Sequence, residues 1–156
     1  DYYRLSAVLG GRVEIGATQL LARAQLGAAG PGLPPHRTFV LGGRGTLPGE
    51  RFRAFGGRRA ALAHLEWRVD APFPAIPLGS FASTGRSITL APFVALGWSD
   101  RPLPGFPWEE TDGVRPVLGL AVEWLMRLVR IEAGYAPGTG RIGVTVDVSR
   151  EWWGIL

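Results

Sequence analysis

The stretch ALAHLEWRVD, residues 61–70, decides the fold because apolar and polar side chains alternate along it. Its apolar set is Ala61, Ala63, Leu65, Trp67 and Val69, and its polar set is His64, Glu66, Arg68 and Asp70. A period of two predicts a β-strand with one apolar and one polar face. The apolar face would be the core of a soluble sandwich but the outer surface of a membrane barrel, so the function depends on which face lies inside.

Composition narrows the class of protein. The 156 residues suffice for one domain with a real core, and the apolar share of 46% is too high for a disordered chain. The 23 glycines and 13 prolines suit many strands joined by turns. Cysteine is absent from the sequence, which excludes disulfides and thiolate metal sites, and no run of about 18 apolar residues predicts a transmembrane helix. Because the sequence begins at Asp1 and contains no signal-like segment, we interpret it as a fragment or a processed product.

The basic residues are all arginines, 17 in number, and the formal net charge is +4. They are spread singly along the alternating segments, mostly beside Glu or Asp, which argues against a nucleic-acid-binding patch. Basic loops that face acidic lipopolysaccharide would explain the excess equally well.

Seven segments alternate in the same way as the opening stretch. Their ranges are 4–15, 20–26, 61–70, 87–98, 114–124, 129–135 and 142–152. Pro92 and Pro116 weaken two of these strands, since proline cannot donate a ladder hydrogen bond. Helix is the competing interpretation for 58–70 and 117–128, whose composition favours it. The period-two spacing and Gly119 favour strands instead.

The connections between these segments differ in length. GATQ after the first strand and LMRL at 125–128 are tight, 27–59, 99–113 and 136–141 look like loops, and 71–86 is intermediate. If the two tight turns lie on one side of the sheet, the three loops all fall on the other. Short turns on one side and long loops on the other are typical of outer-membrane barrels.

Aromatic residues of the apolar face lie near the strand ends, as in the girdles of membrane barrels. They are Trp67, Trp98, Trp124, Tyr135 and Trp152, while Phe93 is an exception on the polar face. The rest of the apolar face is Ala, Val, Leu and Ile, a smooth surface that suits lipid better than an interlocking core. We therefore expect lipid outside and an enclosed charged face; a soluble sandwich or a lipocalin-like cup is the alternative.

An odd number of strands is awkward for a barrel. Bacterial barrels of one chain normally have an even number, and an open sheet edge cannot face lipid. Either the first residues contribute an eighth strand, or this chain is the C-terminal portion of a larger barrel.

The stretch FVLGGRGTLPGERFRAFGGRRAALAHLEWRV, residues 39–69, resembles the bacterial surface antigen domain, the C-terminal barrel of the BamA/TamA outer-membrane assembly superfamily. The resemblance lies in LGG at 41–43 and LEWR at 65–68, and PFVALGW and the final VTVDVSREWWGIL are similar to the next and the closing strands. It implies an all-β fold, an antiparallel transmembrane β-barrel, in which this chain supplies about seven of sixteen strands, the tenth to the sixteenth. Residues 1–156 would form a single domain.

In that family a long loop folds back into the lumen, where the Arg of an Arg-Gly-aromatic motif pairs with charged residues. The alignment places Pro48-Gly49-Glu50 at this position, so the Arg and the aromatic residue are both replaced. Nearby candidates for the same role are Arg44 with Gly45, Arg51 and Arg53. The lumen residues that the resemblance implies are Glu66, Arg68, Glu123, Glu132 and Asp147. A loop that is only basic and exposed is the alternative.

The sequence predicts no catalytic, cofactor-binding or metal-binding residues. His36 and His64 are far apart and have no cysteine to join them, which argues against a zinc site. The glycines at 42, 43 and 45 are not followed by the GK[ST] of a phosphate loop. We expect no enzyme activity from these residues.

The leading hypothesis is therefore a BamA/TamA-type barrel of the bacterial outer membrane, which by resemblance would insert or translocate proteins or anchor an attached domain. Its partners would be the lipid bilayer and lipopolysaccharide, client outer-membrane or secreted proteins and the remainder of its own barrel, without nucleic acid. A weak seam between the first and last strands would let a client strand pair by β-augmentation, with 142–152 as the last strand. The alternatives are a small self-contained porin-like or structural barrel and a soluble β-domain that binds a ligand.

Overall fold

The computed structural model describes residues 2–80, 83–102 and 104–148. Within these ranges the chain is built from strands, and its one helical element is the short 3₁₀ turn η1 (Pro35–Arg37). The described part contains no helical segment with the length and apolar character needed to traverse a bilayer.

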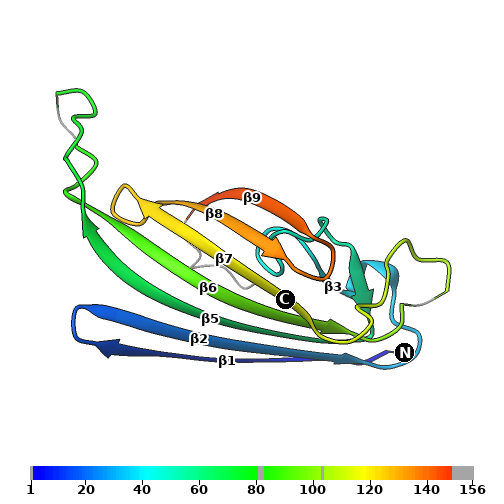
Figure 1. Cartoon of the computed structure of the whole chain (residues 1–156). Helices are drawn as coiled ribbons and strands as arrows, with labels where there is room; N and C mark the ends of the chain where they lie inside the picture. Colours follow the sequence, from blue (N-terminus) through cyan, green and yellow to red (C-terminus); the bar gives the residue numbers. More distant parts are fainter. Residues whose placement is uncertain (1, 81–82, 103, 149–156) are drawn as a thin grey trace.

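Seven strands form one antiparallel sheet in the order β1-β2-β5-β6-β7-β8-β9 (Figure 1). Their bounds are β1 (Arg4–Ile15), β2 (Thr18–Ala29), β5 (Arg59–Pro72), β6 (Ser87–Ser99), β7 (Arg115–Trp124), β8 (Val129–Ala136) and β9 (Arg141–Val148). The sheet is not closed, since β1 and β9 lie at its two edges. The prediction of an all-β chain with about seven antiparallel strands is confirmed.

The strands follow the predicted segments closely, with ends that extend by up to three residues. The largest extension is in β2, predicted over 20–26 and observed at Thr18–Ala29. Pro92 lies inside β6, and there the pairing between β5 and β6 is interrupted at Trp67 and Arg68. This interruption is expected opposite a residue without an N–H group. The predicted last strand reaches residue 152, of which 149–152 lie outside the described residues.

The two faces of the sheet have opposite character. We call the face that carries Glu66, Arg68 and Glu123 the inner face, because the sheet curls around it and a loop lies against it (Figure 1). The outer face carries exposed apolar side chains on every strand of the sheet. They include Leu9, Leu26, Leu65, Trp67, Val94, Leu96, Leu118, Leu120, Ile131, Tyr135, Val144 and Val146.

The aromatic residues lie where the alternation predicts. Trp67, Trp98 and Trp124 oppose the outer-face residues Leu20, Ala61 and Val129 in the sheet register. Trp152 lies outside the described residues. Phe93 points to the inner face, as its place in the sequence predicts, and its ring fills the space above Gly119.

Residues 30–58 form the long connection between β2 and β5, and they fold back over the inner face (Figure 1). This connection, here called the tucked loop, contains η1 and a two-stranded sheet of β3 (Phe39–Leu41) and β4 (Phe55–Gly57). The sequence predicts a loop over this stretch and neither of these strands, because each strand is only three residues long and too short to show alternation.

The connections at the two ends of the sheet differ. Residues 16–17 and 125–128 are tight turns at one end, while the tucked loop and residues 100–102 and 104–114 lie at the other (Figure 1). The connection predicted as a loop at 136–141 also lies at this other end, but it is a short turn over 137–140, because β8 and β9 pair up to Ala136 and Arg141. In the 125–128 turn the consecutive residues Leu125, Met126 and Arg127 have φ of 54°, 56° and 67°, a left-handed backbone that costs non-glycine residues energy. Residues 73–80 and 83–86 extend beyond the sheet at the short-turn end, where the N–H of Phe73 donates to the Arg86 carbonyl at 2.9 Å.

Candidate functional site

The inner face divides into two halves along the strands. At the long-loop end it carries small and apolar side chains, among them Ala60, Leu62, Ala95 and Val117, and the tucked loop packs on them to form the buried core. At the short-turn end it carries charged side chains that are equally buried. The sequence predicts an enclosed charged face, and it does not show that the charged side chains gather in one half of it and the apolar ones in the other.

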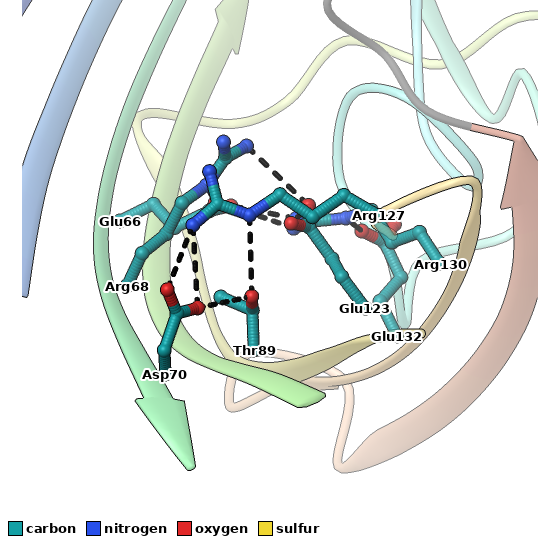
Figure 2. Close-up of polar contacts among 8 residues, drawn as sticks. All are labelled: Glu66, Arg68, Asp70, Thr89, Glu123, Arg127, Arg130 and Glu132. Carbon is teal, nitrogen blue, oxygen red and sulfur yellow. Dashed lines mark hydrogen bonds and ion pairs between the residues drawn. The ribbon is translucent and has the colours of Figure 1, made fainter. Parts of the chain in front are cut away.

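Five charged residues form a connected cluster on the inner face, with Arg130 of β8 at its centre (Figure 2). The Arg130 guanidinium lies 2.6 Å from Glu66 of β5, 2.8 Å from Glu123 of β7 and 3.2 Å from Glu132 of its own strand. Arg68 of β5 lies 2.6 Å from Glu66 and 3.4 Å from Glu123. We call Glu66, Arg68, Glu123, Arg130 and Glu132 the charge cluster; all five are buried.

Small residues let these long side chains meet across the sheet. Glu123 and Arg130 face each other on neighbouring strands, but Glu66 lies two strands away from Glu123. Ala91 and Ala121 lie on the inner face of the strands between β5 and β8, and their side chains leave room for the guanidinium groups to cross. Charges this well buried are tolerated only when they are paired, so the cluster depends on each of its ion pairs.

A smaller polar group joins the strands at the short-turn end. Arg127 of the left-handed turn donates to both carboxylate oxygens of Asp70, at 3.1 and 3.2 Å, and to the Thr89 hydroxyl at 3.3 Å (Figure 2). The Thr89 hydroxyl in turn donates to Asp70. These bonds tie the ends of β5 and β6 to the turn between β7 and β8, and they hold Arg127 in its unfavourable backbone conformation.

Glycines on the inner face provide the space in which the tucked loop lies. A Cβ at Gly27 would collide with the Phe39 ring, one at Gly97 with Leu47, one at Gly134 with the backbone of Pro48, and one at Gly143 with the backbone of Gly49. These four glycines come from β2, β6, β8 and β9, so the loop contacts nearly the full width of the sheet. Larger residues at these positions would leave the loop no room on the inner face.

Arg44 and Asp147 connect the tucked loop to the last described strand. The Arg44 Nε donates to Asp147 Oδ2 at 2.9 Å, and a second guanidinium nitrogen donates to the other carboxylate oxygen. The hydrogen bonds and the negative charge of Asp147 raise the pKa of the Arg44 guanidinium. Gly45, next in sequence, has φ +88°, a left-handed conformation that glycine adopts without strain.

The other candidates from the sequence lie elsewhere. Gly49 lies at the tip of the tucked loop against β8 and β9. Arg51 and Arg53 are exposed and stay away from the charge cluster; the Arg53 guanidinium lies 5.3 Å from the centre of the Phe52 ring. The sequence predicts three arginines of the loop as candidate partners of the lumen carboxylates. Among the described residues, only Arg44 of these three forms an ion pair with a carboxylate of the inner face.

Arg130 is the central residue that the sequence analysis missed as a site residue. Its position on the polar face two residues before Glu132 was visible, but its contact with Glu66 spans 64 residues and depends on the curvature of the sheet. The tight turn at 125–128 places Arg130 opposite Glu123 in the predicted hairpin, and this pairing of opposite charges on the polar face is the signal that could have identified it.

The inner face also encloses a cavity of about 280 Å³ between the tucked loop and strands β1, β2 and β5. Its lining includes Arg23, Gln25, His64 and Arg68. The His64 ring lies 5.2 Å from the Phe93 ring, so the histidine is part of the packing. In the described part of the chain, no three His, Asp or Glu side chains are arranged so as to hold a metal ion.

Comparison of the chain with models of known protein families and with curated proteins gives no match. The function is therefore argued from the geometry of the sheet, the charge cluster and the tucked loop.

Proposed function

We propose that this chain is the C-terminal part of a BamA/TamA-type β-barrel in the bacterial outer membrane, where it takes part in the assembly or translocation of client proteins. In this proposal the outer face contacts lipid, the inner face lines the lumen and further strands complete the barrel. The chemistry of the site supports binding and positioning, with no reaction at the charge cluster.

The observation that carries the proposal is the inverted burial of apolar and charged side chains. Leu65, Leu120 and Val146 are 46%, 47% and 61% exposed, whereas Glu66 and Glu123 are 3% and 5% exposed. A soluble domain buries its leucines and leaves its glutamates in water. Hydrocarbon around the outer face would cover the apolar side chains and make the inner face the only place for charge.

The tucked loop supports the BamA/TamA type over an open pore. It packs a buried core of its own against the inner face, and it is joined to β9 by the Arg44–Asp147 ion pair. A loop in this position occupies the lumen that a porin would keep open for solutes. Two of the three connections at one end of the sheet are tight turns, and two of the three at the other end are long loops, a bias that agrees with the periplasmic and extracellular sides of such a barrel.

Two neighbouring residues of β1 allow a matched test of this orientation. Leu9 lies on the outer face and Val8 on the inner face, and both are exposed near the middle of the strand. Arginine on a lipid-facing site near the midplane destabilises a barrel by about 2–4 kcal/mol, whereas arginine on the lumen side is mild. We therefore expect Leu9→Arg to lower the free energy of unfolding from lipid vesicles by about that amount and Val8→Arg to change it little.

Urea titration of the protein refolded into vesicles would measure both variants. Equal effects of the two substitutions would refute the lipid-facing assignment, as would a wild-type protein that stays monodisperse in water without detergent.

A further inference from the structure

Arginines that are scattered along the sequence gather at the long-loop end of β1, β2 and β5. Arg37 belongs to η1, Arg58 lies between β4 and β5, and Arg59 begins β5. We call these three residues the arginine rim. Among the described residues, no carboxylate pairs with any of their guanidinium groups.

Backbone contacts hold the arginine rim together. The Arg4 side chain donates from Nε to the Arg37 carbonyl at 3.1 Å, and its guanidinium stacks 4.2 Å from the centre of the Phe39 ring. The N–H of Ala29, which is the partner of Arg4 in the sheet, donates to the Arg58 carbonyl at 2.8 Å. These bonds fix the backbone of Arg37 and Arg58 against the ends of β1 and β2. Arg4 holds the Arg37 backbone in place but is not one of the three residues of the rim.

The acidic residues near the rim lie in the loop after β6 and form no ion pair with the rim among the described residues. The carboxylate of Asp100 accepts a hydrogen bond from the backbone N–H of Arg59 at 2.9 Å. Glu109 is hydrogen-bonded through its backbone to Ala54 and Gly56. The Glu110 carboxylate lies 3.8 Å from the Arg101 guanidinium, and Asp112 is the fourth acidic residue of this loop. The guanidinium groups of the rim therefore have no carboxylate partner in the described part of the chain.

Exposed apolar surface lies directly beside the rim. Leu5 and Leu26 lie on the outer face near the long-loop ends of β1 and β2, and both are exposed. Tyr2 and Tyr3, which are also exposed, precede β1 at the same end. Free guanidinium groups next to a strip of apolar and aromatic residues match a molecule with an anionic head and hydrocarbon tails.

We propose that Arg37, Arg58 and Arg59 bind the phosphate groups of a phosphorylated lipid of the outer leaflet, whose acyl chains lie along Leu5 and Leu26. This inference rests on the proposed function, because only a membrane around the outer face brings a lipid headgroup to the rim. Guanidinium groups form paired hydrogen bonds with phosphate oxygens, which an ammonium group cannot do with the same geometry. The rim therefore selects lipids by phosphate as well as by charge.

The test is lipid binding by the full-length protein in detergent micelles, measured by native mass spectrometry with lipid A, a bisphosphorylated acylated disaccharide, as the probe. The triple variant Arg37→Gln/Arg58→Gln/Arg59→Gln should bind lipid A at least about tenfold more weakly than the wild type. The matched control is Arg51→Gln/Arg53→Gln/Arg101→Gln, which loses the same charge from exposed arginines elsewhere in the same loops. It should change the affinity by less than about threefold, which separates a defined site from general attraction.

Three results would overturn the inference. Equal loss in both triple variants would indicate general electrostatic attraction, equal binding of dephosphorylated lipid A would exclude phosphate recognition, and full competition by inorganic phosphate would indicate a site for the free anion. The outcome is separable from that of the proposed function. A wild-type protein that inserts into vesicles and passes the Leu9 and Val8 test but ignores lipid A disproves the rim alone, whereas failure of insertion disproves both.

Discussion

At the scale of the single residue, Arg130 is the charged side chain at the centre of the charge cluster. Its guanidinium contacts three carboxylates that come from β5, β7 and β8, and it is buried with them. Removal of one partner from a buried ion-pair network leaves charge without compensation, which is strongly destabilising. The Arg44–Asp147 pair differs, because Arg44 is exposed and such pairs contribute little to stability.

The replacement Arg130→Met keeps an unbranched, flexible side chain and removes the charge. We expect the free energy of unfolding to fall by about 3–5 kcal/mol, since Glu66, Glu123 and Glu132 would lose the guanidinium group that they share. Urea titration in detergent micelles or vesicles measures this change.

Arg12→Met is the control for Arg130→Met, because Arg12 lies on the inner face of the exposed edge strand β1. It should change stability by less than about 1 kcal/mol. The double variant Arg130→Met/Glu66→Gln should recover part of the loss. If Arg130→Met were no more harmful than Arg12→Met, the charge cluster would have no structural role.

At the scale of the element, the tucked loop is held on the inner face mainly by close packing against glycines of the sheet. Four inner-face glycines leave room for Phe39, Leu47, Pro48 and Gly49, and these contacts span the sheet from β2 to β9. The sequence showed a loop rich in Gly and Arg, and the resemblance implied that it folds inward. Neither could show that Gly27, Gly97, Gly134 and Gly143 would be its contact points, because these glycines come from four different strands and meet the loop only when it folds back over the sheet.

Gly134→Ala tests this shape fit, since its Cβ would collide with the Pro48 backbone. Overpacking of this kind costs about 1–3 kcal/mol, so the loop should leave the inner face at least about fivefold more often. The sequence contains no cysteine, so a Thr46→Cys reporter, buried at the loop tip, can be labelled by a maleimide only when the loop opens.

The control for the loop experiment is Gly10→Ala, which lies on the inner face of β1 with only an ordinary contact of 3.6 Å to the Ala22 carbonyl. Its labelling rate should equal that of the Thr46→Cys parent. An unchanged rate in Gly134→Ala would mean that the loop is held by something other than the glycine contacts.

At the scale of the whole molecule, the sheet is curved and open, and its two edge strands are β1 and β9. Each edge strand has hydrogen-bonding groups along one side that pair with no other strand among the described residues. A sheet edge cannot remain unpaired in lipid, so the proposed barrel requires partners for both β1 and β9. In the proposed barrel the last strand would be the edge to which a client strand adds, because β-augmentation uses a free edge and the resemblance places this strand at the seam.

A photo-crosslinking amino acid at Val144 of β9 tests this use of the edge in cells. We expect crosslinks from Val144 to unfolded outer-membrane proteins during their synthesis. Val94 is the matched control, because it has the same residue type and the same outer face but lies on β6 in the interior of the sheet. Equal crosslinking from both positions, or none from Val144, would contradict a client-binding edge.

The sequence alone determined the all-β class, the seven strands of the main sheet, the two faces of each strand and two of the tight turns, but it did not show that the connection at 136–141 is a turn as short as that at 125–128. These features are local, since a period of two and a run of turn residues depend only on near neighbours in the chain. The short strands β3 and β4, the apolar half of the inner face, the central place of Arg130 and the gathering of the arginine rim were decided by the tertiary structure. Each of them depends on how far the sheet curves and where the tucked loop lies, and both are set by packing between residues that are distant in sequence.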